Sequence, residues 1–157
     1  TVKGFFKKVE GSLDTLLEAL DAVFVEQKPF LVESGEYRID DVGIGYDCSL
    51  LDGKQNQKLY AFREKIVAAV RPFMAADCDF AASDLGNPYE AHITLGFRDI
   101  PLSLYDDVLA YLAQGPFIEE PFLSQIFHFL AFSSEDWSGS WWHSLTWRLI
   151  KSWHLQN

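Results

Sequence analysis

The sequence predicts an α+β fold with antiparallel sheets in a single domain that spans residues 1–157. Amphipathic helical patterns alternate with short apolar runs, no linker of biased composition separates them, and two strand-like runs close the chain as a hairpin. Of the 157 residues, 48% are hydrophobic and 23% charged. This composition and length suffice for one well-buried globular domain.

The first expected elements are a helix and two short strands. Leucines at helical spacing follow the capping residue Ser12, and the pattern ends before Pro29. We expect strands at 30–33 and 42–50, separated by a polar turn at 35–41.

The later elements follow from the same signals. In chain order we expect a helix that ends near 71, a looser segment at 75–90, a strand at 91–97, a helix at 103–114, and a strand pair at 123–132 and 141–150 joined by a turn at 133–139. Pro72 discourages continuation of the second helix, and Gly115 is a typical helix stop.

An approximate internal repeat relates residues 1–31 to residues 94–123. Gly4 and Gly96, Leu20 and Leu112, and Pro29 and Pro121 are all separated by 92 residues. A register kept across several elements indicates a duplication. Thr1 then corresponds to Thr94, the counterpart of His92 falls two positions before Thr1, and the first repeat is N-terminally incomplete.

The strand 91–97 directs two polar side chains to one face. Residues two apart on a strand point the same way, so His92 and Thr94 share a surface while Ile93 and Leu95 take the other. An isolated His-x-Thr on a strand is commonly part of a half-exposed sheet. The repeat gives this pair a second interpretation as half of a two-part site.

The His-Ile-Thr-Leu-Gly-Phe segment, the amphipathic helix after it, the closing hairpin and the repeat resemble the 2H phosphoesterase superfamily, which includes the 2′-5′ RNA ligase-like and cyclic phosphodiesterase proteins. The resemblance implies two lobes related by a pseudo-twofold axis, each an antiparallel sheet backed by helices, with a central cleft. It also implies that each lobe supplies one His-x-Thr or His-x-Ser. The sequence departs from this pattern in one respect: it contains the histidine of the second motif, His92, but not the histidine of the first motif.

The resemblance implies a metal-independent hydrolase that cleaves a 2′,3′-cyclic or related cyclic phosphate and needs no cofactor. By this resemblance His92 is an acid/base residue, Thr94 is its phosphate donor, and Thr1 is the donor of the other half. Imidazole suits acid and base roles because its unperturbed pKa, about 6.5, is near neutral pH. Hydroxyl donors stabilise charge that develops on phosphate oxygens.

Three aromatic residues near the expected cleft, Tyr89, Phe97 and Trp137, are candidates for stacking on a nucleobase. The other histidines fit structural roles. We expect His128 to pack within a strand, and His143 and His154 to lie at the surface or at an edge. His143 and Thr146 do not form a second His-x-Thr, because residues three apart on a strand point to opposite faces.

The formal charge of −10 argues against a protein that binds long nucleic acids through lysines and arginines. We therefore expect a small cyclic phosphate nucleotide or an RNA terminus as the partner, and a monomer. Cys48 and Cys78 fit no metal-ligand spacing and indicate free thiols in a reducing cytoplasm. No apolar run approaches the ~18 residues needed to cross a membrane.

Two alternatives to the cyclic phosphodiesterase remain open. A catalytically inactive two-lobed module would hold a phosphorylated ligand or a protein without turnover, and the absent first histidine favours it. A 2′-5′ RNA end-processing or ligase enzyme is the other alternative, and the acidity of the chain argues against it.

Overall fold

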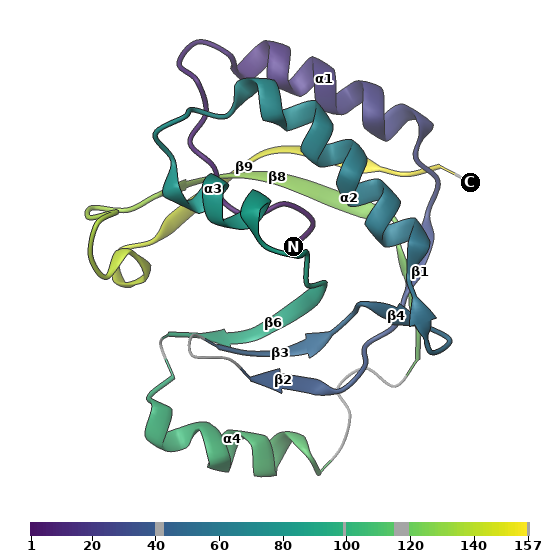
Figure 1. Cartoon of the computed structure of the whole chain (residues 1–157), viewed down its shortest axis with the longest axis vertical. Helices are drawn as coiled ribbons and strands as arrows, with labels where there is room; N and C mark the ends of the chain where they lie inside the picture. The colour runs from purple at the N-terminus through teal and green to yellow at the C-terminus, as the bar shows by residue number, and fades with distance from the viewer. Residues whose placement is uncertain (40–42, 99, 115–119, 157) are drawn as a thin grey trace.

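A computed structural model describes residues 1–39, 43–98, 100–114 and 120–156 (Figure 1). Its helices are α1 (Leu13–Glu26), α2 (Gln57–Val70), α3 (Asp79–Gly86) and α4 (Tyr105–Leu112), with short 3-10 turns η1 (Arg71–Phe73), η2 (Leu102–Leu104) and η3 (Trp141–His143). Its strands are β1 (Phe30–Val32), β2 (Tyr37–Ile39), β3 (Gly43–Asp47), β4 (Leu50–Leu51), β5 (Lys54–Gln55), β6 (His92–Phe97), β7 (Phe122–Ser124), β8 (Ile126–Ser133) and β9 (Thr146–His154).

The described strands form small antiparallel sheets, which confirms the α+β class. Strands β2, β3 and β6 make a three-stranded sheet in that order, and β1–β7, β4–β5 and β8–β9 make two-stranded ones. In Figure 1, α1 and α2 lie side by side next to β8 and β9, and α4 lies against the sheet that contains β6. Among the described residues, no helix is long and apolar enough to cross a membrane.

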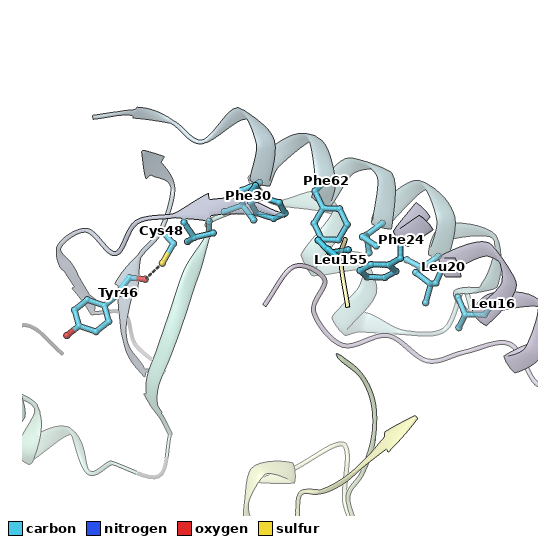
Figure 2. Close-up of a cluster of buried hydrophobic side chains, with 13 residues drawn as sticks. Leu16, Leu20, Phe24, Phe30, Tyr46, Cys48, Phe62 and Leu155 are labelled. Carbon is cyan, nitrogen blue, oxygen red and sulfur yellow. Dashed lines mark hydrogen bonds between the residues drawn. The ribbon is translucent and has the colours of Figure 1, made fainter. Parts of the chain in front are cut away.

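The main core lies between α1, α2 and the β8–β9 hairpin, and it extends to β3. Helix α1 buries Leu16, Leu20 and Phe24. Phe24 stacks on Trp153 of β9 with ring centroids 4.2 Å apart. Figure 2 shows the buried side chains continuing from α1 through Phe30 and Phe62 to Tyr46 and Cys48. The helical spacing of apolar residues therefore predicts the buried face of α1 correctly.

The repeat offset of 92 recurs in the boundaries of the elements. Helices α1 and α4 begin at Leu13 and Tyr105, and strands β1 and β7 begin at Phe30 and Phe122. Strands β1 and β7 also pair with each other, and Leu31 lies opposite Leu123, its counterpart in the repeat. An antiparallel pairing of equivalent residues places a local twofold axis between the two strands.

Several boundaries differ from those expected. The strand expected at 42–50 ends at Asp47, and the one expected at 123–132 is divided into β7 and β8. The predicted turn at 35–41 contains β2, and the looser segment at 75–90 contains α3, a short Ala-containing helix with weak apolar periodicity. Trp141 begins a 3-10 turn rather than a strand, because the Asp136 carboxylate accepts hydrogen bonds from the backbone of Ser138 and Gly139 and organises a longer loop. The expected helix at 103–114 begins as the 3-10 turn η2 and is α-helical only over α4.

The Ser12 side chain also behaves differently from the prediction. It precedes α1 but makes no capping hydrogen bond, and its hydroxyl donates instead to the Val9 carbonyl at 2.6 Å. The expected strand start at Val42 and the helix stop at Gly115 lie outside the described residues.

Candidate functional site

Strand β6 separates polar from apolar side chains across the two faces of its sheet. Leu95 lines an apolar cavity of about 300 Å³ together with Val108 and Tyr111 of α4. His92 lies opposite Asp47, and Thr94 lies opposite Gly45, so both point to the other face. Figure 1 shows α3, β8 and β9 on that side of the sheet. The two residues thus share the face turned away from α4, as alternation predicts.

A β-bulge changes the alternation after Thr94. Ile44 pairs with Gly96 and the next residue, Gly45, pairs with Thr94, so Leu95 is an additional residue on β6. Phe97 pairs with Gly43 and therefore returns to the face of Thr94. Strict alternation would have placed Phe97 with Leu95 on the α4 side.

Close approach of β3 to β6 depends on glycine at two positions. A Cβ atom on Gly43 would lie 2.5 Å from the Gly96 carbonyl oxygen, and one on Gly45 would lie 2.6 Å from the Ile93 carbonyl oxygen. Both distances are too short for an alanine without a backbone shift. The glycines of β3 therefore allow the strand contact that sets the position of His92 and Thr94.

The main chain before β6 orients the His92 imidazole. His92 Nδ1 lies 2.8 Å from the Glu90 carbonyl oxygen. Because a carbonyl oxygen only accepts hydrogen bonds, Nδ1 carries the proton, and the lone pair of the neutral ring is on Nε2. The ring is half-buried. His92 is thus held in one tautomer with Nε2 as the nitrogen able to accept a proton.

Thr94 is exposed two residues further along β6. Its hydroxyl has no hydrogen-bond partner among the described residues, and its cross-strand neighbour Gly45 has no side chain to cover it. The hydroxyl is therefore available to donate to an anion beside the imidazole.

The structure brings Thr1 close to the segment that leads into β6. The Tyr89 hydroxyl donates to the Thr1 carbonyl at 3.0 Å, and Tyr89 lies three residues before His92. The Tyr89 ring contacts Tyr60 edge-on and has the Arg63 guanidinium 4.6 Å from its centroid. The Tyr89 ring is therefore packed against α2.

The match of Thr1 to Thr94 requires one additional residue. Thr1 and Thr94 are 93 residues apart, whereas Gly4 and Gly96, like Phe5 and Phe97, are 92 apart. The match of Thr1 to Thr94 is thus one residue out of register with the match of Gly4-Phe5 to Gly96-Phe97.

Phe97 and Trp137 lie together in an aromatic cluster centred on Trp141. Phe97 contacts Trp141 at 5.7 Å between ring centroids, and Trp137 stacks on Trp141 at 6.0 Å. Phe5, the repeat counterpart of Phe97, contacts Trp141 at 5.5 Å. His92 and Phe97 are five residues apart on β6, which corresponds to about 16 Å along a strand. This cluster is therefore distant from His92.

The remaining histidines have separate environments. His128 is exposed on β8, where its Nδ1 lies 2.8 Å from the Ser152 Oγ of β9. His143 lies in η3 and His154 ends β9, and both are exposed, as expected. His128 was expected to be packed within a strand. It does lie in a strand, but its side chain is exposed instead of packed.

The sequence prediction omits two further polar residues, Arg38 and Glu90, of which only Glu90 has a signal in the sequence. Arg38 lies in β2, within the segment expected to be a turn, and it forms an ion pair with the Glu90 carboxylate. Glu90 lies two residues before His92, a strand-like spacing that could have indicated the same face.

Neither metal-ligand clusters nor disulfides occur among the described residues. No group of three or more His, Cys, Asp or Glu side chains there could hold a metal ion. Cys48 and Cys78 are both free, and burial, with the nearby Asp47 carboxylate, raises the pKa of the Cys48 thiol.

No protein-family model and no curated protein matches this chain.

Proposed function

We propose that this protein is a 2H-type phosphoesterase that hydrolyses a 2′,3′-cyclic or related cyclic phosphate at a nucleotide or RNA end. One observation carries the proposal: β6 directs His92 and Thr94 to one face, and the Glu90 carbonyl holds the imidazole in a single tautomer. An imidazole beside a hydroxyl supplies proton transfer and charge stabilisation at one phosphate.

The pseudo-twofold features support a two-lobed arrangement for this site. Equivalent residues Leu31 and Leu123 pair across β1 and β7, and equivalent residues Phe5 and Phe97 both contact Trp141. In the proposal, one lobe contains β2, β3, β6 and α4, the other contains α1, β8 and β9, and the substrate binds in a cleft between them. The hydrogen bond from Tyr89 to Thr1 supports placing Thr1 at the same site.

The proposed reaction needs one base and one acid on opposite sides of phosphorus. Water attacks phosphorus while the base removes its proton, and the bond to one ribose oxygen breaks as the acid protonates that oxygen. His92 takes one of these roles through Nε2. The resemblance to the 2H phosphoesterases assigns the other role to a second histidine. The Thr94 hydroxyl donates to a non-bridging phosphate oxygen.

The proposal is tested by incubating the full-length protein with 2′,3′-cyclic mononucleotides and with ADP-ribose cyclic phosphate. Product formation is followed by phosphorus NMR and chromatography. His92→Ala should lower kcat by about 10²- to 10⁴-fold, because the proton-transfer group is lost. His128→Ala is the matched control and should retain wild-type turnover, since His128 is a strand histidine partnered by Ser152.

Equal turnover by wild type and His92→Ala would remove His92 from the mechanism. Absence of turnover in wild type, with a cyclic nucleotide bound at a stoichiometry of one, would favour the non-catalytic binding module. Turnover of RNA 2′-5′ linkages alone would favour the end-processing enzyme.

A further inference from the structure

Arg38 occupies a position in the sheet directly in line with Thr94. Arg38 of β2 pairs with Gly45 of β3, and Gly45 pairs with Thr94 of β6. Directly opposed residues in an antiparallel sheet point to the same face. Arg38 therefore emerges on the face of His92 and Thr94, two strand spacings or about 10 Å from Thr94 between Cα atoms.

Gly45 leaves the path from Arg38 to β6 open. Gly45 puts no side chain directly between Arg38 and Thr94, whereas Asp47, two residues further along β3, lies opposite His92 on the same face. The Arg38 guanidinium forms an ion pair with the Glu90 carboxylate, which precedes β6. The main-chain carbonyl of Glu90 accepts the hydrogen bond from His92 Nδ1 at 2.8 Å. One residue, Glu90, thus contacts both the guanidinium and the imidazole.

The Arg38 side chain combines partial burial with a fixed location. It is 31% exposed, whereas the Glu90 carboxylate that binds it is 60% exposed. The next cation along the chain from β6, Arg98, lies over the Trp142 ring at 4.7 Å. In a chain with a formal charge of −10, the Arg38 cation reduces the repulsion that an anionic substrate meets from the Glu90 carboxylate and from Asp47, which lies opposite His92.

We propose that Arg38 binds the non-bridging oxygens of the phosphodiester on which His92 and Thr94 act. The planar guanidinium fork matches two oxygens of one phosphate and gives stronger hydrogen bonds than a neutral donor. The Glu90 carboxylate pairs with Arg38 in the free protein and competes with the phosphate for it. This assignment rests on the proposed function and adds a phosphate-binding residue to it.

The test compares Arg38→Gln and Arg38→Lys with wild type. Arg38→Gln should raise KM for a 2′,3′-cyclic mononucleotide about 10- to 100-fold, since charge-assisted hydrogen bonds to the phosphate are lost. Arg38→Lys should restore part of this loss, because an ammonium keeps the charge but not the fork. Arg71→Gln, which removes an exposed cation from η1, is the charge-matched control and should change KM less than twofold.

Glu90→Gln removes the competing carboxylate but keeps the carbonyl that orients His92, so it should lower KM. Inorganic phosphate binding, measured by calorimetry in the same variants, gives a readout independent of turnover. Thermal melting confirms that each variant is folded.

The outcomes separate the two proposals. If wild type turns over and His92→Ala does not, an unchanged KM in Arg38→Gln overturns the assignment of Arg38 alone. If wild type binds phosphate in a manner that requires Arg38 but cleaves no cyclic phosphate, the phosphate site stands and the phosphoesterase is rejected. If wild type neither binds phosphate nor cleaves a cyclic phosphate, both proposals are rejected.

Discussion

The His92 side chain is oriented by a backbone carbonyl. The Glu90 carbonyl accepts from Nδ1, so any substitution at Glu90 that keeps the main-chain path should preserve the tautomer. Thr94 is placed by its pairing with Gly45, and no described side chain competes for its hydroxyl. A substitution at Thr94 should therefore leave the orientation of the His92 imidazole unchanged, so the role of each side chain can be tested on its own.

Thr94→Val should lower kcat on a cyclic phosphate by about 10²-fold, because a hydrogen-bond donor to the developing charge is removed while the shape of the side chain is kept. Thr94→Ser retains the hydroxyl and should keep most of the activity. Steady-state kinetics of the two variants give the comparison. Similar activities for the valine and serine variants would mean that the hydroxyl is not used.

For these single residues, the sequence predicts the shared face of His92 and Thr94 from strand alternation alone. It does not predict the orientation of Phe97, because the additional residue at Leu95 arises from pairing with β3. Nor does it indicate Arg38, whose relation to Thr94 exists only through the register of three strands.

Among the elements, α1 is attached to β9 by polar contacts as well as by its apolar face. The Asp21 carboxylate accepts hydrogen bonds from Lys151 Nζ at 2.8 Å and from Trp153 Nε1 at 2.7 Å. These two donors, that of Lys151 first, lower the pKa of Asp21. The helix is thus held to the hairpin by a pH-dependent contact.

Asp21→Asn should reduce the free energy of unfolding at pH 7 by about 0.5–1 kcal/mol, the range of a solvent-screened ion pair. Because the folded-state pKa of Asp21 lies below its unfolded value of about 3.9, the stabilisation is present above that value. It is lost as the pH falls through the folded-state pKa. Urea unfolding at pH 7 and at pH 3 should show a smaller difference between variant and wild type at the lower pH.

Glu18→Gln is the control for this prediction, because Glu18 is an exposed carboxylate of the same helix without an ion pair among the described residues. It should leave stability nearly unchanged at both pH values. If the free energies of unfolding of Asp21→Asn and wild type differ as much at pH 3 as at pH 7, the carboxylate charge is not responsible for the difference.

The long periodic elements are the ones that the sequence predicts well. Helices α1 and α2 follow from apolar residues at helical spacing. Helix α3 and strand β2 do not, because each is short and its stability comes from contacts with the rest of the molecule.

For the whole molecule, Trp141 links segments from the two repeats and the β8–β9 connection. It contacts Phe5 near the start of the first repeat and Phe97 at the end of β6, and it stacks on Trp137. The β1–β7 pairing forms a second link between the repeats. The two repeats are therefore joined at both a strand pair and an aromatic cluster.

Trp141→Ala should lower the free energy of unfolding by about 2 kcal/mol or more, because several ring contacts of a half-buried side chain are lost at once. Trp147→Ala removes the same side chain from a position that is 65% exposed and should cost less than about 0.5 kcal/mol. Chemical denaturation of the two variants measures the difference. Equal losses would mean that the Trp141 cluster does not hold the repeats together.

Local patterns in the sequence account for the α+β class, the apolar faces of the long helices, and the shared face of His92 and Thr94. These features depend on periodicities of 3.6 and 2 residues, which are local properties of the chain. The sequence also contained the 92-residue offset that α1, α4, β1 and β7 keep.

The tertiary structure sets which segments meet. It paired Leu31 with Leu123, aligned Arg38 with Thr94 across Gly45, and brought Phe5 and Phe97 to Trp141. The reason is that strand register and side-chain contacts between distant segments depend on the packing of the whole chain, which no local pattern encodes.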